Sequence, residues 1–495
     1  MPGLLQASDF ENIESAPIEG YPFDHLVERA KAAGTLLAGS AAVDITPRYP
    51  KGMYMAGFGP QREARGVADP IFARALVLAD PEKAVALVTL DVIGVLSETS
   101  ARIGAMASAE HPENILVVAV HNHDAPDTIG YWGPALFKLV PVRCGVDPDY
   151  LRFVERMAAL AVHRAANSAV PAELKAARVK APGRICRRLY KIPAAQAAQQ
   201  KDTIFVMSAD DKNGDAIATW IHYDCHAETL WERNQLISAD WPGEVCKFIE
   251  WIRGGTGLVT MGPLAGREPE PVYSGSLRNR FWHKRQTGRA LAETAFQGLV
   301  EKGIELESPR LRLRLARVKL KVESKLLLLA GRTGVIFGRT PKQSAEMSTR
   351  LGFLEIGPVK IALVPGEFSR EAAEPVKDLL GGKLNAVVNL FDTEIGYVLT
   401  EDQFSEKDDW YMQYLKSVSF GKSVFGTLYS RLGELATKAA AEENQPGATG
   451  VEKEDRQPSR LGPPADFGDH GQDDRGTNSE DGNNTAGDED EKNGD

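Results

Sequence analysis

The chain is poor in cysteine and has no long hydrophobic run. Its 495 residues include four cysteines, which are widely separated and form no CxxC pair. This argues against both a disulfide scaffold and a cysteine-rich zinc module. The longest apolar stretches, such as LVTLDVIGVL, are too short and too interrupted to cross a bilayer. The N-terminus also lacks the basic and then apolar segments of a secretory signal. From these absences we predict a cytoplasmic protein without a transmembrane segment.

The chain also lacks a charge imbalance outside its C-terminal end. The net charge is −10, but residues 441–495 hold 16 acidic and 5 basic residues, leaving 52 acidic against 53 basic residues elsewhere. We therefore predict no nucleic-acid partner. The segment 440–495 contains one aromatic residue, Phe467, and cannot bury enough apolar surface to offset its ordering entropy. We predict a disordered acidic tail over 440–495, which either solubilises the protein or contacts a partner.

Strand-like and helical segments alternate over most of the remaining chain. Apolar runs predict buried strands at 85–95, 115–120, 216–224, 359–364 and 385–391. Apolar stripes predict helices at 149–166 and 242–253. No internal repeat of solenoid length is visible. The alternation predicts an α/β fold of mixed β-sheets covered by helices. A catalytic domain over 34–435 would follow a polar leader at 1–33, whose short helix closes at Gly34.

The stretch LRLRLARVKLKV at 311–322 has a different pattern. Its apolar residues occupy odd positions up to 315 and even positions from 318. Because a strand places alternate residues on opposite faces, this change of phase predicts an antiparallel strand with a bulge at Ala316-Arg317. The basic residues would form a solvated face, and binding to an anionic surface is the alternative.

Side chains that can bind a metal follow four of the predicted strands. They are His121 and His123 after 115–120, His226 and Glu228 after 216–224, Glu367 after 359–364, and Asp392, Glu394 and Tyr397 after 385–391. Open α/β sheets build their sites at the carboxyl ends of strands, and two or three histidines with a carboxylate are the ligand set of a catalytic zinc. On an extended segment, His121 and His123 would share one face. We therefore predict a zinc site at these strand ends.

The same residues allow other interpretations. Taken by itself, His226 could be a histidine of the core with its hydrogen bonds satisfied. Taken by itself, Glu367 could be an acidic residue at the start of a helix. The run HNHDAPD also reads as a degenerate HxHxxD motif ending at Asp127, which would indicate a dinuclear hydrolase of the metallo-β-lactamase type. No histidine directly follows Asp127 to complete that set.

Five blocks resemble the catalytic N-terminal domain of the neutral/alkaline non-lysosomal ceramidases and their bacterial relatives. They are AGSAAVDITP with MAGFG and DPIFARALVLAD, HNHDAPDTIGYWG, CHAETL with ISADWPG, LVPGEF, and IGYVLT. The blocks occur in the family's order over about residues 35–415. Each block is short, so the ordered set carries the resemblance.

The resemblance implies roles for individual residues. His121, His226 and Glu367 would be zinc ligands, and Tyr397 a phenolic ligand or near-ligand. His123 would lie beside the metal-bound water or the scissile carbonyl, and His123 or Tyr397 would donate to the developing oxyanion. Two further residues, Asp240 and Glu228, would support the ligands from outside the metal's coordination sphere, and Asp240 alternatively caps the following helix.

The implied activity is zinc-dependent hydrolysis of a linear amide, in ceramide or another N-acyl compound, by attack of zinc-bound hydroxide. The partner would be a small-molecule or lipid amide, with contact to a membrane surface left open. The chain departs from the family pattern at MGPLAGREPEP (261–271), where a Gly-Asp-(Val/Ile)-(Ser/Asn)-Pro block is usual, and in its missing leader peptide. A catalytically silent relative that binds metal or lipid and acts as an interaction protein is therefore the alternative.

Overall fold

The structure is a computed structural model that describes residues 20–136, 140–183, 185–192, 200–270, 276–332, 345–405 and 409–443. The predicted tail beyond 443 and the leader before residue 20 lie outside the described residues. Helix α12, described below, continues to Glu443, past the predicted start of the tail at Ala440. No helix in the described ranges is long and apolar enough to span a membrane.

One order of elements occurs three times along the described chain. Each repeat has three antiparallel strands, a helix, a fourth strand parallel to the third, and a further helix. Repeat 1 contains β1 (Leu37–Asp44), β3 (Phe72–Ala79), β4 (Ala84–Leu90), α3 (Ser97–Ala107), β5 (Ile115–Ala119) and α4 (Pro148–Asn167). Repeat 2 contains β8 (Val170–Lys180), β10 (Thr203–Asp211), β11 (Ala216–Tyr223), α6 (Asp240–Arg253), β13 (Thr256–Met261) and α7 (Leu277–Lys302). Repeat 3 contains β16 (Leu311–Lys321), β17 (Glu346–Ile356), β18 (Val359–Leu363), α9 (Arg370–Leu380), β20 (Asn385–Val388) and α12 (Ser423–Glu443).

Shorter elements connect the repeats and surround their loops. They are η1 (Pro22–His25), α2 (Leu26–Ala33), β2 (Gly66–Val67), η2 (Pro112–Asn114), β6 (Ala135–Leu136), β7 (Val140–Pro141), β9 (Cys186–Arg188), β12 (Leu236–Ile237), β14 (Arg267–Pro269), β15 (Ile304–Glu305), α8 (Lys325–Arg332), β19 (Glu367–Phe368), β21 (Tyr397–Val398), α10 (Glu401–Ser405) and α11 (Trp410–Val418). Helix α2 ends at Gly34 in the left-handed conformation, as the sequence predicted.

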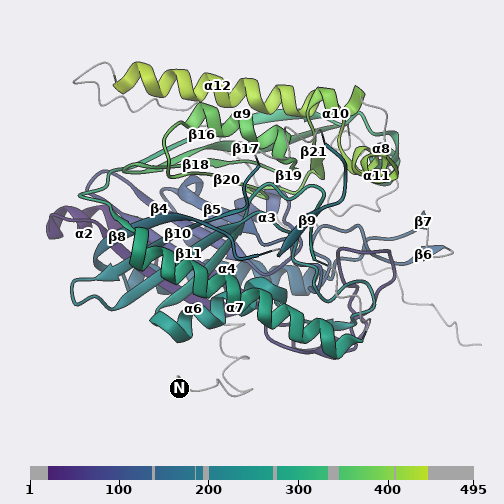
Figure 1. Ribbon diagram of the computed structural model, residues 1–495, viewed down its shortest axis with the longest axis horizontal. Coiled ribbons are helices and arrows are strands. Elements are labelled where there is room, and N and C mark those ends of the chain that lie inside the picture. The colour runs from purple at the N-terminus through teal and green to yellow at the C-terminus, as the bar shows by residue number, and fades with distance from the viewer. Residues whose placement is uncertain are drawn as a thin grey trace, which may run out of the picture. The chain divides into compact units, whose positions relative to one another are not determined.

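The repeats assemble into four layers. Repeats 1 and 2 join through β1 and β8 into one sheet, to which β15 adds a further strand, and repeat 3 forms a second sheet. Figure 1 shows α6 and α7 on one side of the two sheets and α9 and α12 on the other. Apolar clusters fill the helix–sheet, sheet–sheet and sheet–helix spaces. The predicted α/β fold of mixed sheets covered by helices is confirmed.

The predicted strands are apolar because they are buried on both faces. Every residue of β4 and of β5 is buried. Helix α4 begins where expected, because Pro148 occupies its first turn and the Asp147 side chain accepts hydrogen bonds from two backbone amides. The predicted strand 85–95 is shorter in the structure, ending at Leu90, and α6 begins two residues before Pro242.

The prediction of a bulge within 311–322 is wrong. Strand β16 is antiparallel to β17, as predicted, but the pairing runs without a register shift from Leu311 to Lys321. The apolar phase changes because the two ends of the strand bury opposite faces. Leu311 packs between the two sheets, whereas Val318 and Leu320 pack toward α9 and α12. A strand whose two halves are buried on opposite faces therefore shows the same change of apolar phase as a strand with a bulge.

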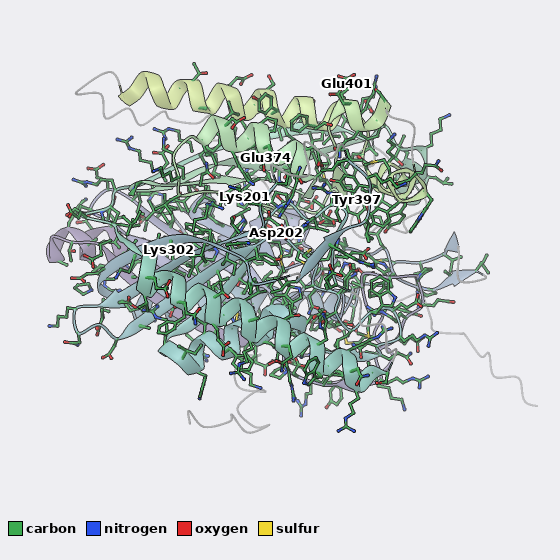
Figure 2. The ribbon with its side chains drawn as sticks, in the orientation of Figure 1. Lys201, Asp202, Lys302, Glu374, Tyr397 and Glu401 are labelled. Carbon is green, nitrogen blue, oxygen red and sulfur yellow. The ribbon has the colours of Figure 1, made fainter. Side chains whose placement is uncertain are left out.

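A group of largely buried charges links repeats 2 and 3. The Asp202 carboxylate accepts hydrogen bonds from Arg370 at 2.5 Å and from Arg267 at 2.8 Å, and Arg370 also contacts Asp224 at 3.3 Å. The side chains of Arg370 and Arg267 are 4% and 6% exposed. Figure 2 shows Asp202 in the central region between the helix layers. Asp202 therefore pairs with two desolvated guanidinium groups, of which Arg370 has Asp224 as a second, more distant partner.

We expect Asp202→Asn to lower the free energy of unfolding by about 3 kcal/mol, because it leaves buried positive charges without their partner. Urea denaturation followed by circular dichroism would measure the change. Asp149→Asn is the control, because Asp149 is 88% exposed in its pair with Arg152 and should change stability by less than about 1 kcal/mol. Equal small effects from both variants would contradict a stabilising role of the buried group.

Candidate metal centre

Loops from all three repeats meet at one place, at the ends of the predicted strands. His121 follows β5 of repeat 1, His226 follows β11 of repeat 2, and Glu367 follows β18 of repeat 3. The Glu367 Oε2 atom lies 3.3 Å from His121 Nε2 and 3.1 Å from His226 Nε2. All three side chains are buried. The structure thus brings together the three side chains that the sequence predicted as metal ligands.

Backbone carbonyls set the orientation of both imidazole rings. His121 Nδ1 lies 2.9 Å from the Ile93 carbonyl oxygen, and His226 Nδ1 lies 2.7 Å from that of Arg267. A carbonyl oxygen only accepts hydrogen bonds, so each Nδ1 carries a proton and Nε2 is the ring nitrogen that faces the site. Arg267 belongs to the segment that departs from the family pattern, yet its backbone still orients His226.

The converging atoms form a site that suits a cation. The two Nε2 atoms face Glu367 Oε2, for which the described residues provide no hydrogen bond of good geometry. Three buried acceptors at this separation repel one another unless a proton or a metal ion lies between them. Although burial raises the pKa of Glu367, the imidazoles of His121 and His226 hold it down to about 2. Two histidine nitrogens and a carboxylate fit a catalytic zinc ion.

The paired histidines meet for a different reason from the one predicted. His121 has a φ of 53° and so occupies the left-handed region, which means that the segment is not extended there. The chain turns instead, and the rings of His121 and His123 lie edge to face with their centroids 4.9 Å apart. The ring of His226 lies 5.0 Å from His121 and 5.5 Å from His123. The loop turn, rather than strand alternation, gathers the three imidazoles.

His123 lies beside the candidate ligands in a closely packed environment. Its Nδ1 atom is 3.3 Å from Glu228 Oε2, its ring is 5.1 Å from the Phe58 ring, and its backbone carbonyl accepts a hydrogen bond from Arg62. Burial, followed by the nearby His121, His226 and Arg62, lowers the pKa of His123 well below its usual value. The ring therefore favours its neutral form, in which one nitrogen is a donor and the other an acceptor, and neither nitrogen forms a hydrogen bond with a described residue.

Tyr397 is brought to the site by strand pairing. In the short parallel pair of β19 and β21, Tyr397 lies directly opposite Glu367. Burial, with the nearby Glu367 as the next cause, raises the pKa of Tyr397 well above its usual value, so the hydroxyl keeps its proton. Figure 2 shows Tyr397 on the side of the molecule where α11 lies, and its ring is 6.0 Å from that of Tyr414 in this helix.

The two predicted supporting residues hold neighbouring parts of the site. Asp240 does not cap α6, whose cap residue is Ala239. Its carboxylate instead accepts hydrogen bonds from the Thr229 amide and hydroxyl and from the Trp241 amide. The Trp241 indole donates to the His226 carbonyl at 2.7 Å. Asp240 and Trp241 therefore attach the segment after β11 to α6, while Glu228 contacts His123.

Glu394 is a site residue whose role the sequence did not assign. Its Oε2 lies 4.0 Å from His121 Nδ1, and ligand atoms of His121, Glu367 and Glu394 all lie within 4.8 Å of one another. Burial, and then Glu367, raise the pKa of Glu394 to about 8. Gly94 leaves room for it, because an added Cβ there would be 2.8 Å from Glu394 Cβ. The sequence signal that could have identified Glu394 is its position just after the predicted strand 385–391.

Two acidic residues of the sequence motifs serve the backbone rather than the site. Asp127 accepts hydrogen bonds from the amides of Ile129, Gly130 and Trp132, so its carboxylate is committed to the loop. This contradicts the HxHxxD interpretation of HNHDAPD. Asp392 pairs with the Arg350 guanidinium at 2.6 Å and is likewise committed away from the three candidate ligands.

Comparison with known proteins gives one family match and a shared fold. Residues 36–256 match the family described as neutral/alkaline non-lysosomal ceramidase, N-terminal, a range that includes His121 and His226. No curated protein sequence matches the chain. The fold is similar to the crystal structure of neutral ceramidase from Pseudomonas aeruginosa, with a TM-score of 0.66 and 15% identity over 82% of this chain and 75% of that one. It is also similar to a ceramidase complexed with C2, with a TM-score of 0.64 and 15% identity over 82% and 76% of the two chains. Residues 36–256 are therefore similar to the N-terminal domain of the neutral/alkaline non-lysosomal ceramidases, and the fold is similar to that of the two ceramidase structures.

Proposed function

We propose that the protein is a zinc-dependent hydrolase that cleaves a linear amide bond in ceramide or another N-acyl compound. The observation that carries this proposal is the convergence of His121 Nε2, His226 Nε2 and Glu367 Oε2, with separations of 3.3 and 3.1 Å to the carboxylate oxygen. Both histidine tautomers are set for metal binding by carbonyl groups. The match of residues 36–256 to the ceramidase family supports an amide substrate. A cytoplasmic location stays a prediction.

The side chains of the site divide the proposed reaction between them. His121, His226 and Glu367 would hold the zinc ion, with Tyr397 next to them. When bound, zinc supplies a more acidic water molecule and polarises the substrate carbonyl. The protonated hydroxyl of Tyr397 donates a hydrogen bond to the carbonyl oxygen as negative charge develops on it. His123, whose Nδ1 lies 3.3 Å from Glu228 Oε2, would accept a proton from the attacking water and return it to the leaving amine.

Elemental analysis of the purified protein, combined with an assay of ceramide, other N-acyl amides and matched esters, tests the proposal. We expect one zinc per chain and hydrolysis of at least one amide, lost on chelation and restored by zinc. Zinc binding without any turnover would favour the silent metal-binding relative instead. Hydrolysis that survives complete removal of metal would overturn the proposal.

A further inference from the structure

A small charged cavity lies beside the candidate metal centre. Its volume is 210 Å³, and its lining includes Arg187, Glu228, Trp231, Glu270 and Arg280. Pockets for drug-sized ligands typically measure about 300–1,000 Å³ and are mostly apolar. This cavity is smaller and carries four ionisable side chains, so it suits a short polar group rather than a hydrocarbon chain.

Two of the lining residues connect the cavity to the metal centre. Glu228 lines the cavity and also contacts His123 at 3.3 Å. The Trp231 ring lies 5.4 Å from the Phe58 ring, which in turn packs against His123 at 5.1 Å. A substrate whose amide lies at the metal centre can therefore extend its adjoining half into the cavity.

The two arginines of the cavity have donors that the described protein groups do not use. Arg280 donates to the Leu230 carbonyl at 3.0 Å, and no described carboxylate forms an ion pair with it. Arg187 lies 3.5 Å from Glu268, longer than the roughly 2.8 Å of a strong charge-assisted hydrogen bond, and its Nε is buried without a partner. Only Arg187 Nε is buried without a partner, since the Arg187 side chain is 34% exposed and Arg280 is half-buried, and a ligand with acceptor oxygens would satisfy this donor.

Three carboxyl groups lie around the cavity, and among them Glu228 keeps one buried oxygen, Oε1, without a hydrogen-bond partner. Glu228 faces His123, and Glu268 accepts a hydrogen bond from the Tyr411 hydroxyl at 3.1 Å. Glu270 is only half-buried. The unused hydrogen-bonding capacity of the cavity is therefore mainly that of the two guanidinium groups, whose planar donor sets match a carboxylate or a sulfonate.

We propose that the amine half of the substrate carries an anionic group, as in an N-acyl amino acid, and that Arg187 and Arg280 bind this group in the cavity. This inference rests on the proposed amide hydrolysis. In the reaction the amide C–N bond breaks, the hydroxyl of water joins the acyl carbon, and a proton joins the nitrogen. The products are a carboxylic acid and a free amino acid or aminosulfonate.

Kinetics with a matched substrate series tests the assignment. The series shares one decanoyl chain attached to glycine, taurine, ethanolamine or sphingosine. We expect the wild-type protein to prefer the glycine or taurine conjugate, whichever anion fits. Arg280→Gln should lower kcat/KM for that conjugate by about 10- to 100-fold and change that of the ethanolamine conjugate by less than threefold. Arg289→Gln, an exposed position on the same helix paired with Glu293, is the control and should change neither.

Binding to the metal-free protein separates this inference from the proposed function. We expect calorimetry to detect decanoylglycine or decanoyltaurine binding that is weakened by Arg187→Gln and Arg280→Gln. Hydrolysis of the neutral conjugates with no arginine-dependent preference would overturn the anionic-substrate assignment and leave amide hydrolysis standing. Arginine-dependent binding without turnover of any conjugate would support the anion site and overturn the hydrolase proposal. Absence of both would overturn both.

Discussion

Replacing His226 by alanine is expected to reduce bound zinc to well below one per chain while the fold is retained. The His226 imidazole supplies one of the three candidate donor atoms. His226 Nε2 lies 3.1 Å and His121 Nε2 lies 3.3 Å from the third, Glu367 Oε2. Altering residues that merely support metal ligands typically costs about 10–100-fold in affinity or activity, so loss of a direct ligand should cost at least about 100-fold. Elemental analysis and amide turnover measure the two effects, and circular dichroism checks the fold.

The matched control for this prediction is His111→Ala. His111 is an exposed histidine whose Nδ1 lies 3.5 Å from a carboxylate oxygen of Glu113. This variant should keep the zinc content and the turnover of the unmodified protein. Full retention of zinc by His226→Ala would show that the ligand assignment is wrong.

Replacing Gly57 by alanine is expected to depress turnover strongly while leaving zinc bound. Gly57 has a φ of 102°, and an added Cβ would lie 2.3 Å from His123 Cγ. A nonglycine residue is strained in this conformation, and the ring of His123 must move to admit the methyl group. Proton transfer by a positioned side chain contributes typically 10²–10⁴-fold to a rate, so we expect a loss of at least about 100-fold. Steady-state assays and elemental analysis would measure turnover and zinc.

Gly59→Ala, two residues away in the same MAGFG block, provides a close control. An added Cβ at Gly59 meets no atom within 4 Å, so turnover should stay within about threefold of the unmodified protein. His123→Gln should reproduce the effect of Gly57→Ala, sparing zinc and lowering turnover. If Gly57→Ala removed zinc as completely as His226→Ala, His123 would have to be counted among the ligands.

Much of the candidate site could be predicted because its signals are local. A buried strand needs a short run of apolar residues, and a polar residue at the end of such a run marks the strand's carboxyl end. This pattern placed His121, His226 and Glu367 among eight candidates, the family resemblance implied that these three are ligands, and the structure brings their donor atoms together. Local capping signals also predicted helices such as α2, which ends at Gly34.

The remaining features depend on contacts between distant segments. The carbonyls of Ile93 and Arg267 that orient the two histidines lie 28 and 41 residues from their partners. Glu394 approaches His121 only because repeats 1 and 3 pack together. The change of apolar phase in β16 could not be distinguished from a bulge. The pattern of a strand shows which residues are buried, but it does not show which neighbouring layer covers them.

The sequence alone determined the secondary structure of the core strands, the family resemblance and the candidate ligands, since these follow from the order of residue types along the chain. Tertiary structure decided the threefold repetition of strands and helices, the histidine tautomers and the cavity of Arg187 and Arg280 beside the metal centre. Strand pairing, helix packing and charge proximity join residues far apart in sequence, and no local pattern specifies which of those pairs will meet.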